Sequence, residues 1–294
     1  MSRKKTKVAI VALVLLAIVI GCVIGSSEAD TKGVSGTVNI AGSSALLPLA
    51  QSAAKTFMDK NPDSVINTNG GGSGQGLQQV SDGTIDIGDS DLLAEEKLDK
   101  KSASKLVDHQ VAITVIAPII NKDAGVKSLT TEQLIKVFTG KVTNWKQVGG
   151  NDRQIVLVSR PSSSGTRATF EQYALKKHAS QSNQSLETDD SGTLIQMIQS
   201  VSGSIGYVAL SYLTGDPQVG IVSINGVKPS LKNVYNGKYT VWSYEHMYTK
   251  GQPKGAAKAF LQQMLSEEYG KKIEAMGYGI ASKLTAAAKA THTK

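Results

Sequence analysis

The stretch "RQIVLVSRPSSSGTRATFEQYALKK", from Arg153 to Lys177, contains one complete strand–turn–helix unit. Its first eight residues, dominated by apolar and β-branched side chains, predict a strand. Its last fourteen predict a helix that buries Phe170, Tyr173 and Ala174. Between them, three consecutive serines, a glycine and a threonine stand between two arginines. Small uncharged donors and a cation at a helix start suit the binding of an anion.

Two other segments repeat this arrangement of strand, Gly/Ser-rich turn and helix start. They are "AGSSALLP" (Ala41–Pro48) and "GGGSGQGL" (Gly70–Leu77). Taken singly, each is also explained by ordinary helix N-caps, because Ser and Thr are favoured there. Three such starts meeting at one point would present unpaired N–H groups and positive dipole ends to a ligand. Together they predict an anion site.

Strand and helix patterns alternate along the rest of the chain. His109–Ile120 predicts a long buried strand, and Thr130 with Gln133 predicts a capping box at a helix start. This alternation predicts an α/β fold in which each of two domains has a mainly parallel sheet flanked by helices. Near the N-terminus, one helical face should be buried through Leu46, Leu49, Ala50, Ala53 and Phe57.

The N-terminus has the layout of an export signal. Four cations precede an apolar run of about fourteen residues that ends at Cys22, the only cysteine in the 294-residue chain. "VIGC" resembles a bacterial lipobox, which implies cleavage before Cys22 and a lipid on its sulfur. We therefore expect residues 1–21 to be a lipoprotein signal peptide and 22–35 a lipidated tether. The alternative is an uncleaved signal anchor with an incidental cysteine.

Charge argues against a nucleic-acid partner despite the calculated pI of about 9.3. Removing four cations and no acid with residues 1–21 leaves 28 Lys and Arg against 24 Asp and Glu, a formal net charge of +4. The lysines are scattered along the sequence, and aromatic residues make up only 5% of it. Nucleic-acid binding usually needs a basic stripe with stacking platforms.

Enzyme motifs are missing from the sequence. The P-loop-like segment Gly83–Gly88 lacks the lysine, no serine has the spacing of a nucleophile elbow, and the four histidines are isolated. "DIGDSD" carries three acids but lacks the glycine and distal glutamate of a calcium loop. We predict no catalytic residue, no metal site and no cofactor, so these acids need another explanation.

Four motifs in order, "GSSALLP", "GGGSGQG", "IGDSD" and "SRPSSSGTR", give the chain a family resemblance. It resembles the phosphate-binding lipoproteins of bacterial phosphate ABC transporters, which are type II periplasmic-type solute-binding proteins. "GKVTNWKQVGG" (Gly140–Gly150) and "GSIGYV" (Gly203–Val208) match outside the site. The resemblance runs from about Gly36 to the C-terminal helices.

The resemblance implies a buried phosphate held by neutral donors, one arginine and one acid. Arg160 would supply the charge and Asp91 the acceptor. The other implied phosphate-binding residues are Ser44, Ala45, Leu46, Ser73, Ser164, Gly165 and Thr166. Relatives often carry a hydroxyl where this chain has Leu46, so Ser43 or Ser44 could complete the first loop. Arg167 could instead face solvent or pair with Asp91.

Asp91 suits phosphate because hydrogen phosphate retains a proton that a carboxylate can accept, whereas sulfate does not. An unmatched buried acceptor costs several kcal/mol in total, enough for a discrimination of roughly 10⁴–10⁵. The structural alternatives for Asp91 are a helix N-cap and an ion pair with a lysine. The functional alternatives are a receptor for sulfate, molybdate or a phosphonate, and an exported phosphatase.

The chain should cross between two domains twice. We predict domain I over 36–114 plus 246–294 and domain II over 115–245, with ligand contacts in both favouring closure. The resemblance implies import of phosphate through membrane permease and ATPase subunits. It also implies a protein anchored by the lipid on Cys22 to the outer face of the cell membrane.

Overall fold

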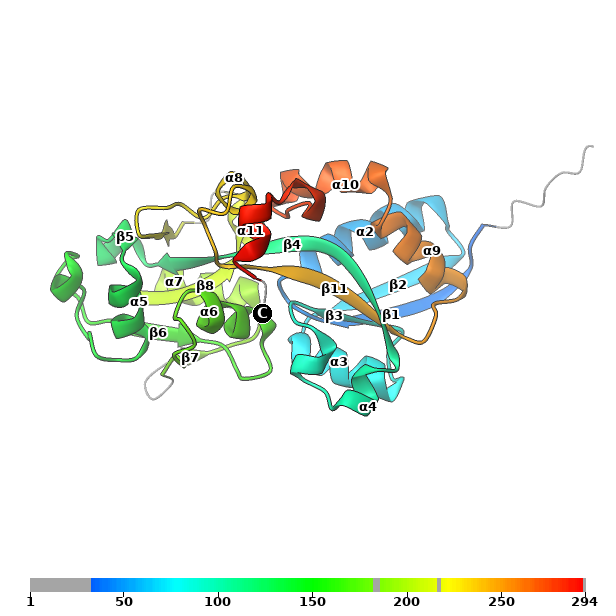
Figure 1. Cartoon of the computed structure of the whole chain (residues 1–294), viewed down its shortest axis with the longest axis horizontal. Coiled ribbons are helices and arrows are strands. Elements are labelled where there is room, and N and C mark those ends of the chain that lie inside the picture. The colour runs from blue at the N-terminus through cyan, green and yellow to red at the C-terminus, as the bar shows by residue number, and fades with distance from the viewer. Residues whose placement is uncertain (1–32, 182–185, 216–217, 293–294) are drawn as a thin grey trace, which may run out of the picture. The chain divides into compact units, whose positions relative to one another are not determined.

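The computed structural model describes residues 33–181, 186–215 and 218–292 (Figure 1). The predicted signal peptide, Cys22 and most of the tether lie outside these residues. No helix within the described ranges is both long enough and apolar enough to cross a membrane.

One nine-stranded sheet is formed by strands that lie between Gly36 and Lys250. Its order is β2-β1-β3-β11-β4-β8-β6-β7, with β9 also paired to β4. The strands are β1 (Gly36–Gly42), β2 (Ser64–Asn69), β3 (Ile87–Ser90), β4 (Leu106–Ile120), β6 (Val156–Ser159), β7 (Leu186–Glu187), β8 (Ser204–Ala209), β9 (Gly220–Ile221) and β11 (Trp242–Lys250). A separate parallel pair joins β5 (Ser128–Leu129) to β10 (Ser223–Ile224).

The predicted α/β class is confirmed, and the sheet is parallel towards both ends. β1 is parallel to β2 and β3, and β6 is parallel to β7 and β8. The antiparallel pairs of this sheet all involve β4 or β11. These two strands therefore connect two parallel parts.

The central strand β4 changes partner along its length. Its first part pairs with β11 from Leu106 to Val115, and its second part pairs with β8 from Ile116 to Ile120. Its buried residues run continuously from Ala112, as expected of a strand covered on both faces. The register of β11 shifts between Glu245 and His246.

Helices cover both faces of the sheet (Figure 1). Beside β1–β3, α2 and α9 pack on one face and α3 on the other. The helices are α2 (Leu47–Lys60), α3 (Ser73–Asp82), α4 (Lys100–Ala103), α5 (Thr131–Phe138), α6 (Gly165–Tyr173), α7 (Ser191–Ser200), α8 (Leu231–Tyr235), α9 (Gly255–Met264), α10 (Glu267–Ile273) and α11 (Ala286–Ala290).

Two of the helix predictions are confirmed in detail. All five residues of the expected α2 face are buried. At the start of α5, the Thr130 hydroxyl accepts from the Gln133 N–H at 3.1 Å. The Gln133 side chain accepts from the Thr130 N–H at 2.9 Å, which completes the capping box.

The helix predicted up to Lys177 ends earlier, at Tyr173. Lys176 and Lys177 have positive φ angles of 50° and 67°, which a right-handed helix excludes. Phe170 and Ala174 are buried as predicted. Tyr173 is only partly buried, and its ring stacks on His292 with centroids 3.9 Å apart.

The apolar interior has two main clusters. One contains Phe57 and Phe260 and lies beside β1–β3, while the other contains Phe138, Trp145 and Trp242. The C-terminal residues Leu284 and Ala288 belong to the second cluster. The division into 36–114 plus 246–294 and 115–245 remains a prediction.

Candidate anion-binding site

Four helix starts lie together, one more than the sequence pattern predicts. The loops before α2, α3 and α6 are joined by the start of α7, which follows β7. The Gly74 N–H donates to the Ser163 carbonyl at 2.9 Å, and the Ser44 hydroxyl donates to the Asp189 carbonyl at 2.8 Å. Parallel strands bring their carboxyl ends to one edge, and loops from separate parts of the chain meet there.

Asp91 lies at the centre of this group, directly after β3, and is 2% exposed. Its carboxylate accepts hydrogen bonds from the hydroxyls of Ser43, Ser73 (3.4 Å) and Thr166 (2.9 Å). Its own N–H donates to Ser73 Oγ at 3.0 Å. The partners of Asp91 are thus hydroxyls from three loops, which matches neither an N-cap nor a lysine ion pair.

Arg160 is fully buried and is held on all sides by oxygen atoms. Its Nη1 donates to the Asp189 carbonyl at 3.0 Å and to Ser44 Oγ at 3.3 Å, and its Nη2 donates to Ser191 Oγ at 2.9 Å. Burial lowers the pKa of the guanidinium, while Tyr207, Asp189 and Asp91 act in the opposite direction. An arginine keeps its proton in such surroundings, so this is a fixed positive charge.

Arg167 follows neither of the two arrangements expected for it. It is partly buried on α6, and its Nε donates to Glu171 at 2.9 Å. Its Nη1 donates to the backbone carbonyl of Arg160 at 2.7 Å. Arg167 therefore supports the loop that carries Arg160, and its hydrogen bonds do not go to Asp91.

In the first loop, Ser43 and Ser44, which the sequence leaves as alternatives, have different partners, and Ser43 is the one that contacts the loop N–H groups. Its hydroxyl accepts from the N–H groups of Ala45 (3.1 Å) and Leu46 (3.2 Å), so both donors point at one place. The Leu46 side chain is fully buried in the apolar cluster beside α2. Ser44 turns instead toward Asp189 and Ser191.

The third loop explains why its glycine is needed. Ser164 is the N-cap of α6, and its hydroxyl accepts from the Arg167 N–H at 3.4 Å. A Cβ at Gly165 would lie 2.2 Å from Ser73 Oγ and 2.9 Å from the Asp91 Cβ. Only glycine lets this backbone approach both residues so closely.

Asp189 and Ser191 are site residues that the sequence analysis did not single out. One carboxylate oxygen of Asp189 lies 3.8 Å from Arg160 Nη1. Burial raises the pKa of Asp189, while hydrogen bonding with the Ser164 side chain and the charge of Arg160 oppose that shift. "ETDDSGT" (Glu187–Thr193) could have revealed them, because it again places small polar residues between a strand and a helix.

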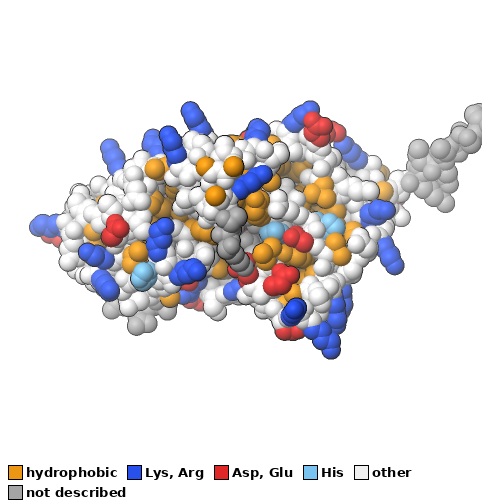
Figure 2. Space-filling view, viewed as in Figure 1, with side chains coloured by type: hydrophobic (Ala, Val, Ile, Leu, Met, Phe, Trp, Pro, Cys, Tyr) orange, Lys and Arg blue, Asp and Glu red, His pale blue; other side chains and the backbone are white. Residues whose placement is uncertain are grey.

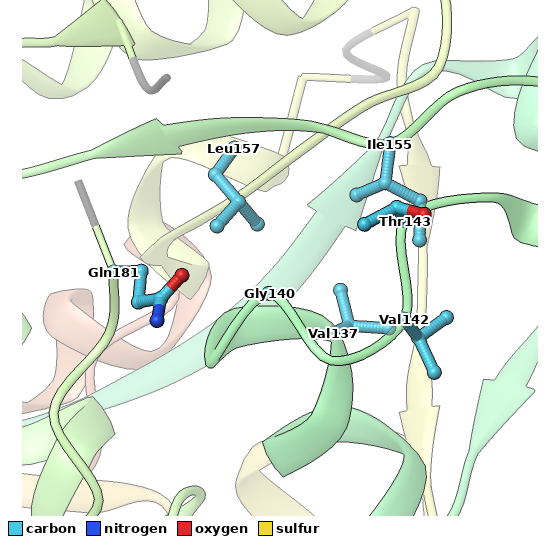
Figure 3. A pocket seen from close by; sticks show the side chains of 7 residues that line it. All are labelled: Val137, Gly140, Val142, Thr143, Ile155, Leu157 and Gln181. Carbon is cyan, nitrogen blue, oxygen red and sulfur yellow. The ribbon is translucent and has the colours of Figure 1, made fainter. Parts of the chain in front are cut away.

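A cavity of about 220 Å³ lies apart from this group of loops (Figure 3). Ile155 and Leu157 line one side, and Val137 and Val142 lie opposite them. Gln181 and Thr143 are its polar side chains, and none of its lining residues is charged. It therefore lacks the groups that would hold a small anion.

Figure 2 shows how charged side chains are distributed on one face of the molecule. On the face shown, Lys and Arg side chains are spread over the molecule, with one small group over α4, where Lys100 and Lys101 lie. Among the described residues, no group of three or more His, Cys, Asp or Glu could hold a metal ion.

A two-part α/β sheet with a buried group of helix starts, hydroxyls, one arginine and the acids Asp91 and Asp189 is the arrangement of a solute-binding class of protein. Residues 27–268 match the PBP superfamily domain, and the chain belongs to this family. It is 49% identical over 248 residues to "Phosphate-binding protein PstS" of Bacillus subtilis, which covers 84% of this chain and 81% of that protein.

Solved structures agree with this assignment. A phosphate ABC transporter substrate-binding protein from Clostridium perfringens, with bound phosphate, superposes with a TM-score of 0.74 at 33% identity. The match covers 83% of this chain and 98% of that one. An ABC-type phosphate transport receptor from Vibrio cholerae shares the fold, with a TM-score of 0.65 at 24% identity over 83% of this chain and 99% of that one.

Proposed function

We propose that this protein is a receptor that binds inorganic phosphate and delivers it to an ABC transporter for import. The observation that carries the proposal is Asp91, a buried carboxylate whose partners are hydroxyls and which lies among helix starts with Arg160. The names of the Bacillus and Clostridium relatives support the same ligand.

The same donors would turn from Asp91 to the ligand. A hydroxyl has one proton, so the groups on Ser73 and Thr166 can donate either to Asp91 or to a phosphate oxygen. The N–H groups of Ala45 and Leu46 would add uncharged donors. The remaining proposed contacts are Ser44, Arg160, Ser164 and Gly165.

Asp91 would then select for the protonated anion. Its carboxylate can accept the hydrogen of hydrogen phosphate but would face only lone pairs on sulfate. A hydrogen bond that involves a charged group contributes about 1.5–3 kcal/mol, or about 10- to 150-fold in affinity, and the cost of leaving the desolvated carboxylate unpaired on sulfate adds to this difference.

Ligand contacts in both predicted domains would favour a closed arrangement. Ser43, Ser73 and Asp91 belong to the predicted domain I, while Arg160 and Thr166 belong to domain II. Two hydrogen bonds already connect residues of the two predicted domains: Thr166 donates to Asp91, and Lys97 Nζ donates to the Ser162 carbonyl at 2.9 Å. A transporter could recognise the closed arrangement by the surface that both domains form together.

Titration calorimetry on the chain from residue 23 onward tests this function with phosphate, sulfate and a phosphomonoester. We expect heat of binding with phosphate, at least about a thousandfold weaker binding of sulfate, and no release of phosphate from the ester. Equal affinity for sulfate would point to a general oxyanion receptor, and released phosphate would point to a phosphatase.

The proposed location rests on the lipid anchor at Cys22. Cys22→Ala should prevent lipidation, so more of the protein should appear in the medium or remain unprocessed. Fractionation and gel mobility would show this, with Ser27→Ala in the tether as the matched control. Unchanged membrane retention and mobility in Cys22→Ala would contradict the lipobox interpretation.

A further inference from the structure

A third buried acid, Glu245, stands next to the proposed phosphate acceptor and has no role in the site described above. It lies on β11 opposite Ala112 of β4, at the point where the register of β11 shifts. One residue further, His246 pairs with Ser90, the last residue of β3. Glu245 therefore lies beside the position where the chain leaves β3 and continues into Asp91.

The Glu245 side chain is completely enclosed. Its exposure is 0%, and no hydrogen bond of ordinary length and angle reaches its carboxylate oxygens from the described residues. Asp91, Asp89 and Thr114 act on it most strongly, and Asp91 and Thr114 do so as side-chain hydrogen-bonding neighbours. A buried ionised carboxylate without a partner is strongly unfavourable.

Three carboxyls thus share one buried region, since Asp89 is 1% exposed and Asp91 is 2% exposed. Glu245 raises the pKa of Tyr212 and of Tyr278, and these tyrosines donate to the carbonyls of Ser44 and Ala45 in the first loop. The side chains that act most strongly on Glu245 are Asp91, Asp89 and Thr114, and none of these is a cation. Arg160 acts on Asp91 and Asp189 instead.

Burial, followed by the charges of Asp91 and Asp89, raises the pKa of Glu245 well above its ordinary value. Burial and the charge of Asp91 raise the pKa of Asp89 in the same way. Adjacent carboxyls in a dry site do not all ionise, because like charges at short range repel strongly. Two of the three acids should therefore carry a proton.

We propose that Glu245 is a positioning residue of the anion site, which retains a proton and directs its O–H toward Asp91. Asp91 then holds the one negative charge of the three-carboxyl group and keeps lone pairs for the ligand proton. The statement that Asp91 keeps lone pairs for the ligand proton rests on the proposed function, in which Asp91 accepts that proton. The protonation of Glu245 itself does not depend on any ligand.

The arrangement explains how a site rich in acids could hold a dianion. If Glu245 and Asp89 were both ionised, two uncompensated negative charges would lie behind Asp91, close to the bound anion. With both neutral, the site presents Arg160 and one carboxylate, and the remaining groups are dipoles. Glu245 would also supply Asp91 with a donor when Ser73 and Thr166 turn toward the ligand.

Glu245→Gln tests the proposal, because glutamine is neutral, has the same shape and retains an N–H donor. Two measurements are needed on the full folded protein near neutral pH. The infrared difference spectrum between the wild type and Glu245→Gln should show the C=O band of one protonated carboxyl, because the protonated Asp89 contributes equally to both proteins. Calorimetry should show a phosphate affinity within about threefold of the wild type.

Asp108→Asn is the matched control, because Asp108 is a half-exposed carboxyl on β4 that pairs with His246 rather than with the site. It should leave both the protonated-carboxyl absorption and the affinity unchanged. Equal protonated-carboxyl absorption in the wild type and Glu245→Gln would overturn the proposal, because the protonated Asp89 contributes equally to both proteins. So would a tenfold or greater gain in phosphate affinity, which is the result expected from removing an ionised carboxylate near a dianion.

The infrared band also separates this inference from the proposed function. If the wild type fails to bind phosphate but the difference spectrum shows the band of one protonated carboxyl, the proton on Glu245 stands and the ligand assignment is wrong. If phosphate binds but the wild type and Glu245→Gln have equal protonated-carboxyl absorption, the proposed function stands and this inference is wrong.

Discussion

Asp91 is the acid that the loop hydroxyls surround, and under the proposed function it would decide which anion the site accepts. Asparagine at this position keeps the shape, removes the charge and offers an N–H that a sulfate oxygen can accept. Asp91→Asn should therefore move the ratio of phosphate to sulfate affinity toward sulfate by at least about tenfold, or ~1.4 kcal/mol. Calorimetry of both anions at one pH and one salt concentration measures the ratio.

The ratio is a better measure than phosphate affinity alone, because removing a carboxylate near a dianion also relieves repulsion. Asp108→Asn serves again as the control and should leave the ratio unchanged. If Asp91→Asn has the wild-type ratio, Asp91 does not detect the ligand proton, and Asp89 is the next acid to test.

The buried acids also show which individual residues can be predicted from the sequence and which cannot. Asp91 and Arg160 stand in recognisable motifs, and the structure brings them into one buried group. Glu245 stands in "YTVWSYEHMYTK", where an acid among aromatic residues gives no sign of a buried position. Its placement depends on the register shift in β11, which is set by pairing with distant strands.

At the scale of elements, the start of α6 is fixed by close contact with the turn before α3. Gly165→Ala should weaken phosphate binding by at least about tenfold, because its Cβ would push Ser73 and Asp91 away from their positions. Calorimetry would measure the loss, and circular dichroism would show that the fold remains.

Gly270→Ala in α10 is the matched control. A Cβ there meets nothing within 4 Å, and alanine favours the helix, so stability should rise by roughly 0.5–1 kcal/mol with phosphate affinity unchanged. If Gly165→Ala binds phosphate as tightly as the wild type, the start of α6 does not contribute to phosphate binding.

Elements were predictable wherever local chemistry determines them. The α2 face follows from helical spacing, and the capping box of α5 follows from two side chains. The early end of α6 was missed because Lys176 and Lys177 carry no turn signal in their side chains. The start of α7 has the same strand–turn–helix pattern as the starts of α2, α3 and α6. The pattern is hard to recognise in the sequence, because the preceding strand, Leu186–Glu187, has only two residues.

At the scale of the whole molecule, His292 links the C-terminal end to the second apolar cluster. Its ring is stacked between Tyr173 at 3.9 Å and Trp242 at 3.6 Å, and its Nε2 lies 2.7 Å from the Trp242 carbonyl. Burial lowers the pKa of His292 to about 4, against an ordinary value of 6.5, and the hydrogen bond to Trp242 opposes the shift.

This shift predicts a loss of stability in acid. Between about pH 6.5 and about pH 4 the unfolded chain binds a proton at His292 that the folded chain does not, so folding becomes less favourable as the pH falls. Phenylalanine retains a stacking ring but cannot titrate. From about pH 7 to about pH 4.5, the wild type should lose about 1–2 kcal/mol more stability than His292→Phe, a figure reduced for partial exposure.

Urea denaturation at several pH values measures this difference. A parallel pH dependence of wild type and His292→Phe would mean that His292 is protonated equally in the folded and unfolded chains.

The position of β11 has a consequence for the order in which the chain can fold. β11 lies between β3 and β4, although it follows them by more than a hundred residues. When the chain is synthesised or exported with its N-terminus first, the edges of β3 and β4 that pair with β11 stay open until residues 242–250 have also appeared. Open strand edges are templates for pairing with other chains. The two halves of the sheet are thus joined late, and the interval before β11 arrives is when aggregation competes most strongly with folding.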